Sequence, residues 1–257
     1  MPSLKWKDFI RSHPFEVEDA WWFPRRIRSL MTDYLRILFE FSGVYDKAVP
    51  QLKDAIVRSG VFQILDLCSG SGGPIADLAE RVGMETGRAL QVVLSDKYPP
   101  SPRPRLPAGV AYLESPVDAA RVPRDLEGFR TLFTSFHHFP ERAARSILND
   151  AVEQGRGIAV FEVTHATLWH FLLVLGTPLY VAALTPLALP FSVSRLFWTF
   201  IVPAVPIFAL WDGVVSNFRS YSLQEWRELV TSFPSYDWNI GCCRGLVPVY
   251  YLIGCPR

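Results

Sequence analysis

Cysteine is scarce in this 257-residue chain, which contains only Cys68, Cys242, Cys243 and Cys255. These four lack the paired short spacings of a zinc site and are too few for a disulfide-stapled scaffold. An excess of charge of one sign is lacking too, because 26 basic residues nearly balance 25 acidic residues for a formal net charge of +1. The composition therefore favours a reducing compartment and gives no indication of a nucleic-acid partner.

An uninterrupted apolar stretch is also missing from residues 1–19, where charged residues are scattered throughout. A secretory signal needs such a stretch, so none is expected. We expect the folded part of the protein to be cytoplasmic.

Between residues 50 and 163 short β-rich runs alternate with helix-compatible stretches. This pattern is typical of parallel strands joined by crossover helices, and it places the chain in the α/β class. The expected strands are residues 62–67, 91–95, 110–113, 131–134 and 157–163, followed by a helix at 223–233 and two last strands at 238–241 and 249–253. Together they predict a seven-stranded, mostly parallel sheet. Ser222 and Glu225 have the spacing of a capping box before the last helix.

Residues 63–74 read QILDLCSGSGGP, an apolar strand that ends in Asp66 and is followed by a glycine-rich turn. Glycine lets the backbone turn sharply and approach a ligand closely, and Pro74 suits the start of the next helix. Such a turn holds a nucleotide or amino-acid group at a helix N-terminus. The dinucleotide-binding pattern G-x-G-x-x-G would need glycine at position 75, where the chain has Ile75, so a nicotinamide oxidoreductase is disfavoured.

This turn resembles the first motif of class I S-adenosylmethionine-dependent methyltransferases, an acid followed by a glycine-rich turn. The resemblance covers about residues 62–163 and implies a Rossmann-like sheet with S-adenosyl-L-methionine as cofactor. With its aromatic cap and apolar insertion, the chain looks like a little-characterised bacterial branch of these enzymes. The resemblance implies contacts to the methionine part of the cofactor from the residues of this turn: Asp66, Cys68, Ser69, Gly70 and Gly72. Cys68 and Ser69 stand where the commoner form of the motif has glycine and cysteine.

Two more acids follow expected strands. Asp96 closes the second strand, and the resemblance implies that it accepts hydrogen bonds from the ribose hydroxyls. Asp118 follows the third strand, and the resemblance implies a hydrogen bond to the adenine amino group. The alternatives are a simple turn residue for Asp96 and an Asx turn for Asp118. The predicted cofactor site also includes Lys97, Ala119 and Ser135.

Two histidines, His137 and His138, follow the fourth strand, at the sheet edge where ligands bind in open α/β folds. Many class I methyltransferases have a similar pair there, and neutral imidazole can remove a proton from a hydroxyl or amine. The alternative is a histidine that only shapes the turn. Glu162 ends the fifth strand and is predicted either to orient the substrate or to cap the next helix. Because adjacent histidines do not have zinc-ligand spacing, we predict no metal.

An aromatic, mostly helix-compatible segment precedes the sheet, and Pro24 stands where a helix could begin. We interpret residues 1–60 as a helical cap in which Trp22 and Tyr34 contact the substrate, and we expect His138 to contact it as well. Three aromatic residues followed by three arginines also fit a membrane-surface feature or a substrate lid or, alternatively, an aromatic staple with a solvated basic face: Trp21, Trp22, Phe23, Arg25, Arg26 and Arg28.

After the fifth strand, residues 163–194 include no Asp, Glu, Lys or Arg, and residues 196–211 include none either. We therefore expect a hydrophobic helical insertion at 164–212, between a cofactor-binding core at 61–163 and a C-terminal part at 213–257. Two interpretations stay open: membrane insertion, in which the chain enters and returns on the same side, and a lid that is soluble or forms a homodimer. The first would hold the protein at the inner face of the cytoplasmic membrane.

The resemblance predicts in-line methyl transfer, in which the cofactor carries the difficult chemistry and the protein supplies proximity and orientation. The apolar insertion and aromatic cap favour a hydrophobic small-molecule acceptor of the quinone, polyketide or lipid type. The alternative function is a non-catalytic, cofactor-binding, membrane-associated module.

Overall fold

The computed structural model describes residues 15–100, 106–188 and 191–257. The chain divides into two compact units, each built from two separate segments. One unit holds the described residues of Met1–Ser42 together with Thr164–Ser220, and the other holds Gly43–Val163 together with Tyr221–Arg257. We refer to them as the helical unit and the sheet unit.

The sheet unit is built on one seven-stranded sheet with the order β3-β2-β1-β4-β5-β7-β6. Its strands are β1 (Gln63–Asp66), β2 (Gln91–Leu94), β3 (Val110–Tyr112), β4 (Phe129–Phe133), β5 (Ile158–Glu162), β6 (Tyr236–Cys243) and β7 (Val249–Pro256). The first five are parallel, whereas β7 runs antiparallel to both β5 and β6. The prediction of a seven-stranded, mostly parallel sheet is therefore confirmed.

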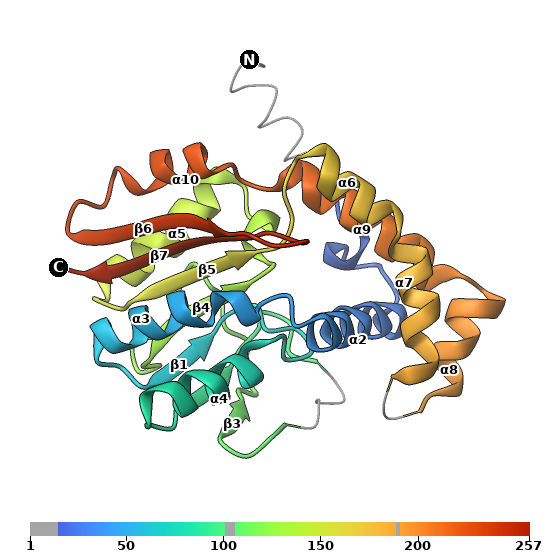
Figure 1. The fold of residues 1–257 in the computed structure, drawn as a ribbon, viewed down its shortest axis with the longest axis horizontal. Helices are drawn as coiled ribbons and strands as arrows, with labels where there is room; N and C mark the ends of the chain where they lie inside the picture. Colours follow the sequence, from blue (N-terminus) through green and yellow to red (C-terminus); the bar gives the residue numbers. More distant parts are fainter. Residues whose placement is uncertain (1–14, 101–105, 189–190) are drawn as a thin grey trace. The chain divides into compact units, whose positions relative to one another are not determined.

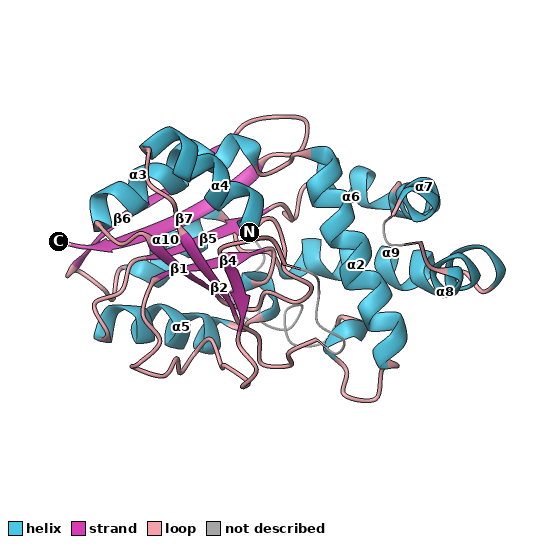
Figure 2. Ribbon diagram, turned by 90° about the horizontal axis from the view of Figure 1, so that it is seen from below, coloured by secondary structure: helices cyan, strands magenta, loops and turns pink. Residues whose placement is uncertain are grey.

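The centre of this sheet sets the place of the site. In register, Asp66 at the end of β1 lies opposite Leu94 of β2 and Thr131 of β4. All five residues of β4 and of β5 are buried, because helices cover both faces of a parallel sheet. The turns that leave β1, β2 and β4 therefore emerge side by side at one edge of the sheet (Figure 2).

Helices α3 (Val49–Ser59) and α4 (Ile75–Thr86) cover one face, and α5 (Glu141–Glu153) and α10 (Leu223–Val230) cover the other (Figure 1). A cluster of buried side chains that includes Leu132, Ile147 and Trp226 fills the space beneath α5 and α10. Helix α10 begins with the capping box predicted at Ser222 and Glu225.

Several strand and helix ends differ from the expected ones. β4 begins at Phe129, before the expected residue 131, and includes Arg130, which is fully buried. A charged residue argues against a central strand, but the guanidinium of Arg130 donates to Asp150 of α5 at 2.7 Å. β6 and β7 extend beyond the expected 238–241 and 249–253 because their pairing continues to Tyr236 and Pro256. α10 ends at Val230 rather than at residue 233.

The helical unit consists of short helices around α2 (Arg25–Ser42), which starts directly after Pro24. Its other elements are η1 (Val17–Asp19), α6 (Leu168–Leu175), α7 (Thr177–Leu184), η4 (Thr185–Leu187), α8 (Val193–Leu196), the π-helical turn η5 (Phe197–Ile201) and α9 (Ala204–Arg219). A small core containing Phe23, Met31, Val181 and Val205 joins α2 to α7 and α9.

None of the described helices is by itself long and apolar enough to cross a bilayer. Two consecutive pairs satisfy that test together, but each is bent: Leu168–Leu175 with Thr177–Leu187 by 42°, and Val193–Ile201 with Ala204–Arg219 by 73°.

The two units divide the chain differently from the four expected segments. α3 was expected in the cap, but its apolar side chains Leu52 and Ile56 are fully buried and the helix packs on α4 and β7. α9 continues past the expected boundary at 212 to Arg219. Asp212 lies within this helix and is buried, and its carboxylate accepts the backbone N–H of Val17 at 2.7 Å.

Candidate active site

The turn after β1 requires an unusual backbone. φ is positive at Cys68 (59°) and at three glycines, Gly70 (49°), Gly72 (114°) and Gly73 (54°). Glycine adopts this region without steric cost, whereas Cys68 does so against the preference of an L-residue. The glycines at 70, 72 and 73 are therefore needed for the shape of this turn.

Hydrogen bonds join this turn to the end of β2. The backbone N–H of Ser69 donates to the carbonyl oxygen of Ser95 at 2.9 Å, and the Ser95 hydroxyl donates to the carbonyl oxygen of Asp66 at 2.8 Å. The N–H of Gly72 donates to the Ser69 carbonyl at 2.7 Å. The glycine turn and the second strand thus form one rigid edge.

Asp66 is a buried carboxyl at the tip of the central strand. Its two oxygens accept hydrogen bonds from the hydroxyls of Ser69 and Thr131, both at 2.6 Å. Burial, with a smaller contribution from the nearby charge of Asp96, raises the pKa of Asp66 to about 7, although both hydroxyls favour the ionised form. A buried carboxyl with a raised pKa thus stands at the predicted cofactor motif.

Asp96 connects to the same turn. One carboxylate oxygen accepts the N–H of Gly70 at 2.9 Å, and the other accepts the N–H of Tyr98 at 2.7 Å. Burial raises the pKa of Asp96, while these backbone N–H groups and the charge of His138 oppose the shift. The structure thus brings Asp96, the predicted ribose ligand, to the predicted methionine-binding turn.

Tyr112 is a further residue of this edge that the sequence did not reveal. It ends β3, and its hydroxyl donates to the Gly70 carbonyl oxygen at 3.0 Å. No sequence signal identified it, because one tyrosine at a strand end has no pattern of its own.

The fold brings the segment before Asp118 to Asp96, because the N–H of Val117 donates to the Asp96 carbonyl oxygen at 2.9 Å. Its carboxylate accepts the N–H of Ala120 at 3.0 Å, the geometry of an Asx turn, and the ammonium of Lys97 at 2.9 Å. The hydrogen bond from Lys97 is the main cause that lowers the pKa of Asp118. Ala119 is buried in the core under α5. The Asx turn thus exists, and an adenine contact by Asp118 stays a prediction.

His137 and Glu162 form a buried pair across the ends of β4 and β5. One Glu162 oxygen accepts the backbone N–H groups of Phe136 and His137 at 2.7 and 3.2 Å. The other lies 2.8 Å from Nδ1 of His137. A carboxylate at this distance holds the proton on Nδ1, which makes Nε2 the basic nitrogen of the ring.

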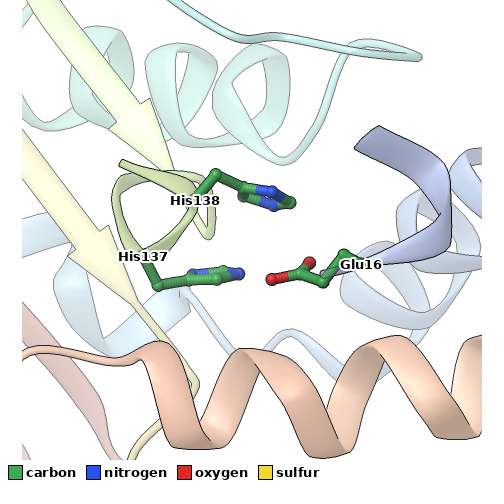
Figure 3. Close-up of side chains that lie close together, drawn as sticks. All are labelled: Glu16, His137 and His138. Atoms are coloured by element: carbon green, nitrogen blue, oxygen red, sulfur yellow. The ribbon is translucent and has the colours of Figure 1, made fainter. Parts of the chain in front are cut away.

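The second histidine stands on the same turn. Figure 3 shows both imidazoles projecting from η3 (Phe136–His138), with ring centroids 4.5 Å apart and the planes inclined by 30°. His138 is also close enough to Asp96 for its charge to lower the pKa of that acid. The histidines, Glu162 and Asp96 thus belong to one cluster.

The residues between β4 and η3 add two features. Thr134 has a positive φ of 43° and shares a hydrogen bond with the hydroxyl of Tyr45. Ser135 is buried, and among the described residues its hydroxyl has no hydrogen-bond partner. A buried hydroxyl without a partner is costly, so its presence beside the site fits a ligand that would supply one.

The predicted substrate contacts lie in the helical unit. Trp22 is exposed, with its ring edge-on to Phe15 and Phe23 at centroid distances of 6.3 Å. Tyr34 is buried in the small core, and its hydroxyl has no hydrogen-bond partner among the described residues. Their roles toward a substrate remain predictions.

A groove of about 960 Å³ lies elsewhere on the sheet unit, between residues 120–124 and α5. It is lined by arginines that include Arg121, Arg124 and Arg142. Neither the glycine turn nor the histidines line this groove, so we do not assign the cofactor to it.

Comparison with known proteins gives a fold match. No protein-family model matches the chain, and no curated protein matches it. Among solved structures, the plantazolicin methyltransferase BpumL in complex with SAH has a TM-score of 0.56, with 10% sequence identity over 98% of this chain and 97% of that chain. The methyltransferase domain of bacterial CtHen1 has a TM-score of 0.49, with 10% identity over 82% of this chain and 99% of that domain.

At 10% identity, the likeness to BpumL establishes the fold. The chain thus has the α/β fold of class I methyltransferases, as its sequence predicted. Its activity has to be argued from the site itself.

Proposed function

We propose that this protein is an S-adenosylmethionine-dependent methyltransferase that transfers a methyl group in line to a hydrophobic small molecule. The observation that carries the proposal is the hydrogen bond from the Gly70 N–H to Asp96, because it joins the two parts of the cofactor motif at one sheet edge. Open α/β sheets bind their ligands at this edge.

The residues present fit this cofactor. Asp66, Ser69, Gly70 and Gly72 would hold the methionine end, where a carboxylate suits the cofactor's ammonium group. A Cβ built at Gly73 would meet no atom within 4 Å, so the turn leaves room beside its backbone. Asp96 would accept the ribose hydroxyls, Asp118 with Lys97 and Ala119 would border the adenine, and Ser135 would gain a partner for its buried hydroxyl. The bound cofactor supplies an electrophilic methyl group.

The histidines of η3 would remove the proton from the acceptor. Glu162 orients His137 so that Nε2 carries the lone pair, and this arrangement suits a general base for a hydroxyl or amine. Glu162 acts as a positioning residue in this scheme. His138, next to Asp96, would face the reacting group together with His137.

A hydrophobic acceptor of the quinone, polyketide or lipid type is supported by the composition of the chain. Residues 163–194 carry no charged side chain, and exposed aromatic residues such as Trp21 and Trp22 flank α2. A charged metabolite would gain little from contact with side chains of this kind.

The test is calorimetric titration of the purified protein with S-adenosylhomocysteine and, separately, with NAD. We expect saturable binding of S-adenosylhomocysteine at one site per chain and no binding of NAD. Binding of NAD alone would overturn the proposal. A screen of hydrophobic phenols, quinones and lipids with methyl-labelled cofactor then identifies the acceptor.

A further inference from the structure

The helical unit exposes many large apolar side chains outside its small core. Each helix from α6 through α9 contributes to this surface. The exposed residues are Leu168, Trp169, Leu172, Leu175, Leu179, Tyr180, Leu187, Phe191, Val193, Phe197, Phe200, Ile201, Val202, Ile207, Trp211 and Phe218. A water-soluble helical bundle places such residues in its core and polar residues outside.

The interior of the same segment holds paired polar groups beside the apolar core residues Val181 and Val205. Thr185 and Thr199 are buried and share a hydrogen bond of 3.2 Å between their hydroxyls. Arg195 is also buried and donates to the carbonyl oxygen of Ala188 at 3.1 Å and to Asp33 of α2 at 3.2 Å. Polar groups that pair inside while apolar groups face outward are characteristic of protein parts that lie in lipid.

The surface of this segment lacks the polar border of a protein interface. Residues 164–218 contain only two charged residues, Arg195 and Asp212, and both are buried. Asp212 is satisfied inside, where it accepts the N–H groups of Val17 and Glu18 at 2.7 and 3.2 Å. Interfaces between protein subunits have an apolar centre and a polar, solvated rim. This feature favours lipid over a second copy of the chain.

The two ends of the segment lie together. The hydroxyl of Ser220, after α9, donates to the hydroxyl of Thr164, before α6, at 2.8 Å. A segment whose ends meet must enter and leave a membrane on one side. Together with the bends of 42° and 73° within the helix pairs, this geometry fits insertion into one leaflet rather than a span.

Side chains suited to a membrane surface accompany this segment. Trp21 and Trp22 are exposed before α2, and the first residues of that helix, Arg25 and Arg26, are exposed as well. Tryptophan is typical of the boundary between lipid and water, and arginine binds anionic headgroups.

We propose that the helical unit is a membrane anchor that seats the exposed surface of residues 164–218 in one leaflet of an anionic bilayer. The anchor rests on this unit alone and does not depend on the methyltransferase reaction.

The experiment is flotation of the full-length protein with vesicles of phosphatidylcholine, with and without phosphatidylglycerol. We expect the protein to float with both and more strongly with the anionic vesicles. The test variant combines Leu172→Glu, Leu179→Glu and Ile201→Glu, three exposed positions on different helices. Because carboxylates resist transfer into lipid, vesicle binding should fall on the order of 100-fold.

A matched control carries the same number of glutamates on exposed apolar positions of the sheet unit: Val57→Glu, Met84→Glu and Leu246→Glu. It should float like the natural protein. Circular dichroism verifies the fold of each variant, and Arg25→Glu provides a milder test that should reduce binding to the anionic vesicles alone.

Two outcomes would overturn the anchor. One is a natural protein that does not float with either vesicle. The other is a natural protein that is a dimer by light scattering while the test variant is a monomer. A second copy of the chain would then cover this surface. Neither outcome alters the titration with S-adenosylhomocysteine, so failure of the anchor and failure of the enzymatic proposal are distinguishable.

Discussion

Nδ1 of His137 lies 2.8 Å from the carboxylate of Glu162, and the pair joins the ends of the neighbouring strands β4 and β5. Glu162 also accepts the backbone N–H groups of Phe136 and His137, so a single carboxylate fixes both the turn and the ring. Glu162 therefore sets the tautomer of His137.

We expect Glu162→Gln to reduce kcat by about tenfold to 1,000-fold, because an amide N–H facing Nδ1 disfavours the tautomer that has its lone pair on Nε2. Affinity for S-adenosylhomocysteine should change little. The measurement is the steady-state rate across pH, together with calorimetric binding, once an acceptor is known. His137→Ala should give a comparable loss.

The control for this variant is Glu80→Gln, an isosteric change of an exposed glutamate on α4. It should leave kcat unaltered. A Glu162→Gln enzyme with the natural rate and pH profile would remove His137 from the mechanism.

Asp66 should make the stability of the protein depend on pH. Its pKa is raised to about 7 in the folded chain, above the ordinary 3.8, mainly by burial. Between these values the folded state keeps a proton that the unfolded state releases. The contribution of protonated Asp66 to the free energy of unfolding is therefore complete below about pH 4 and is lost as pH rises toward about 7. This contribution changes by about 4 kcal/mol at most.

The side chain in Asp66→Asn is neutral at every pH. The free energy of unfolding of this variant minus that of the natural protein should therefore rise between pH 5 and pH 8. Urea unfolding at both values measures this difference. Asp54→Asn, at an exposed position on α3, serves as the control and should show no such trend. A constant difference for Asp66→Asn would mean that the carboxyl is already ionised at pH 5.

Much of the sheet and the cofactor motif could be predicted from local sequence. The run that ends in Asp66 identifies β1 because it is apolar and is followed by glycines, and Asp96 was found from its place after the next strand. Both signals are short-range, since a strand and its turn are specified by adjacent residues.

Contacts between distant segments could not be predicted in this way. Tyr45 shares a hydrogen bond with Thr134, and Tyr112 reaches the Gly70 carbonyl oxygen, but neither pair leaves a pattern along the chain. The start of β4 was not predicted because it includes the charged residue Arg130, whose partner Asp150 lies on another element. Such pairings become visible only when the fold brings the elements together.

We expect Asp96→Ala to weaken binding of S-adenosylhomocysteine by about tenfold to 100-fold, the usual effect of losing hydrogen bonds to a charged group. Part of the loss would come from the turn, because Asp96 also accepts the Gly70 N–H. Tyr112→Phe separates the two effects: it removes a hydrogen bond to Gly70 but leaves the ribose acceptor, so its loss should be smaller. Equal affinities of Asp96→Ala and the natural protein, measured by calorimetry, would exclude the ribose role.

Cys68 stands in the glycine turn with a φ of 59°, at a position where an L-residue is strained. Cys68→Gly and Cys68→Ala both remove the thiol, and only the glycine relieves the backbone. We therefore expect the glycine variant to be more stable than the alanine variant by about 1 kcal/mol in urea unfolding. In the regular helix α4 the order should reverse, with Ala76→Gly costing about 1 kcal/mol relative to the natural alanine. Equal stability of the two Cys68 variants would show that the turn stores no strain at this residue.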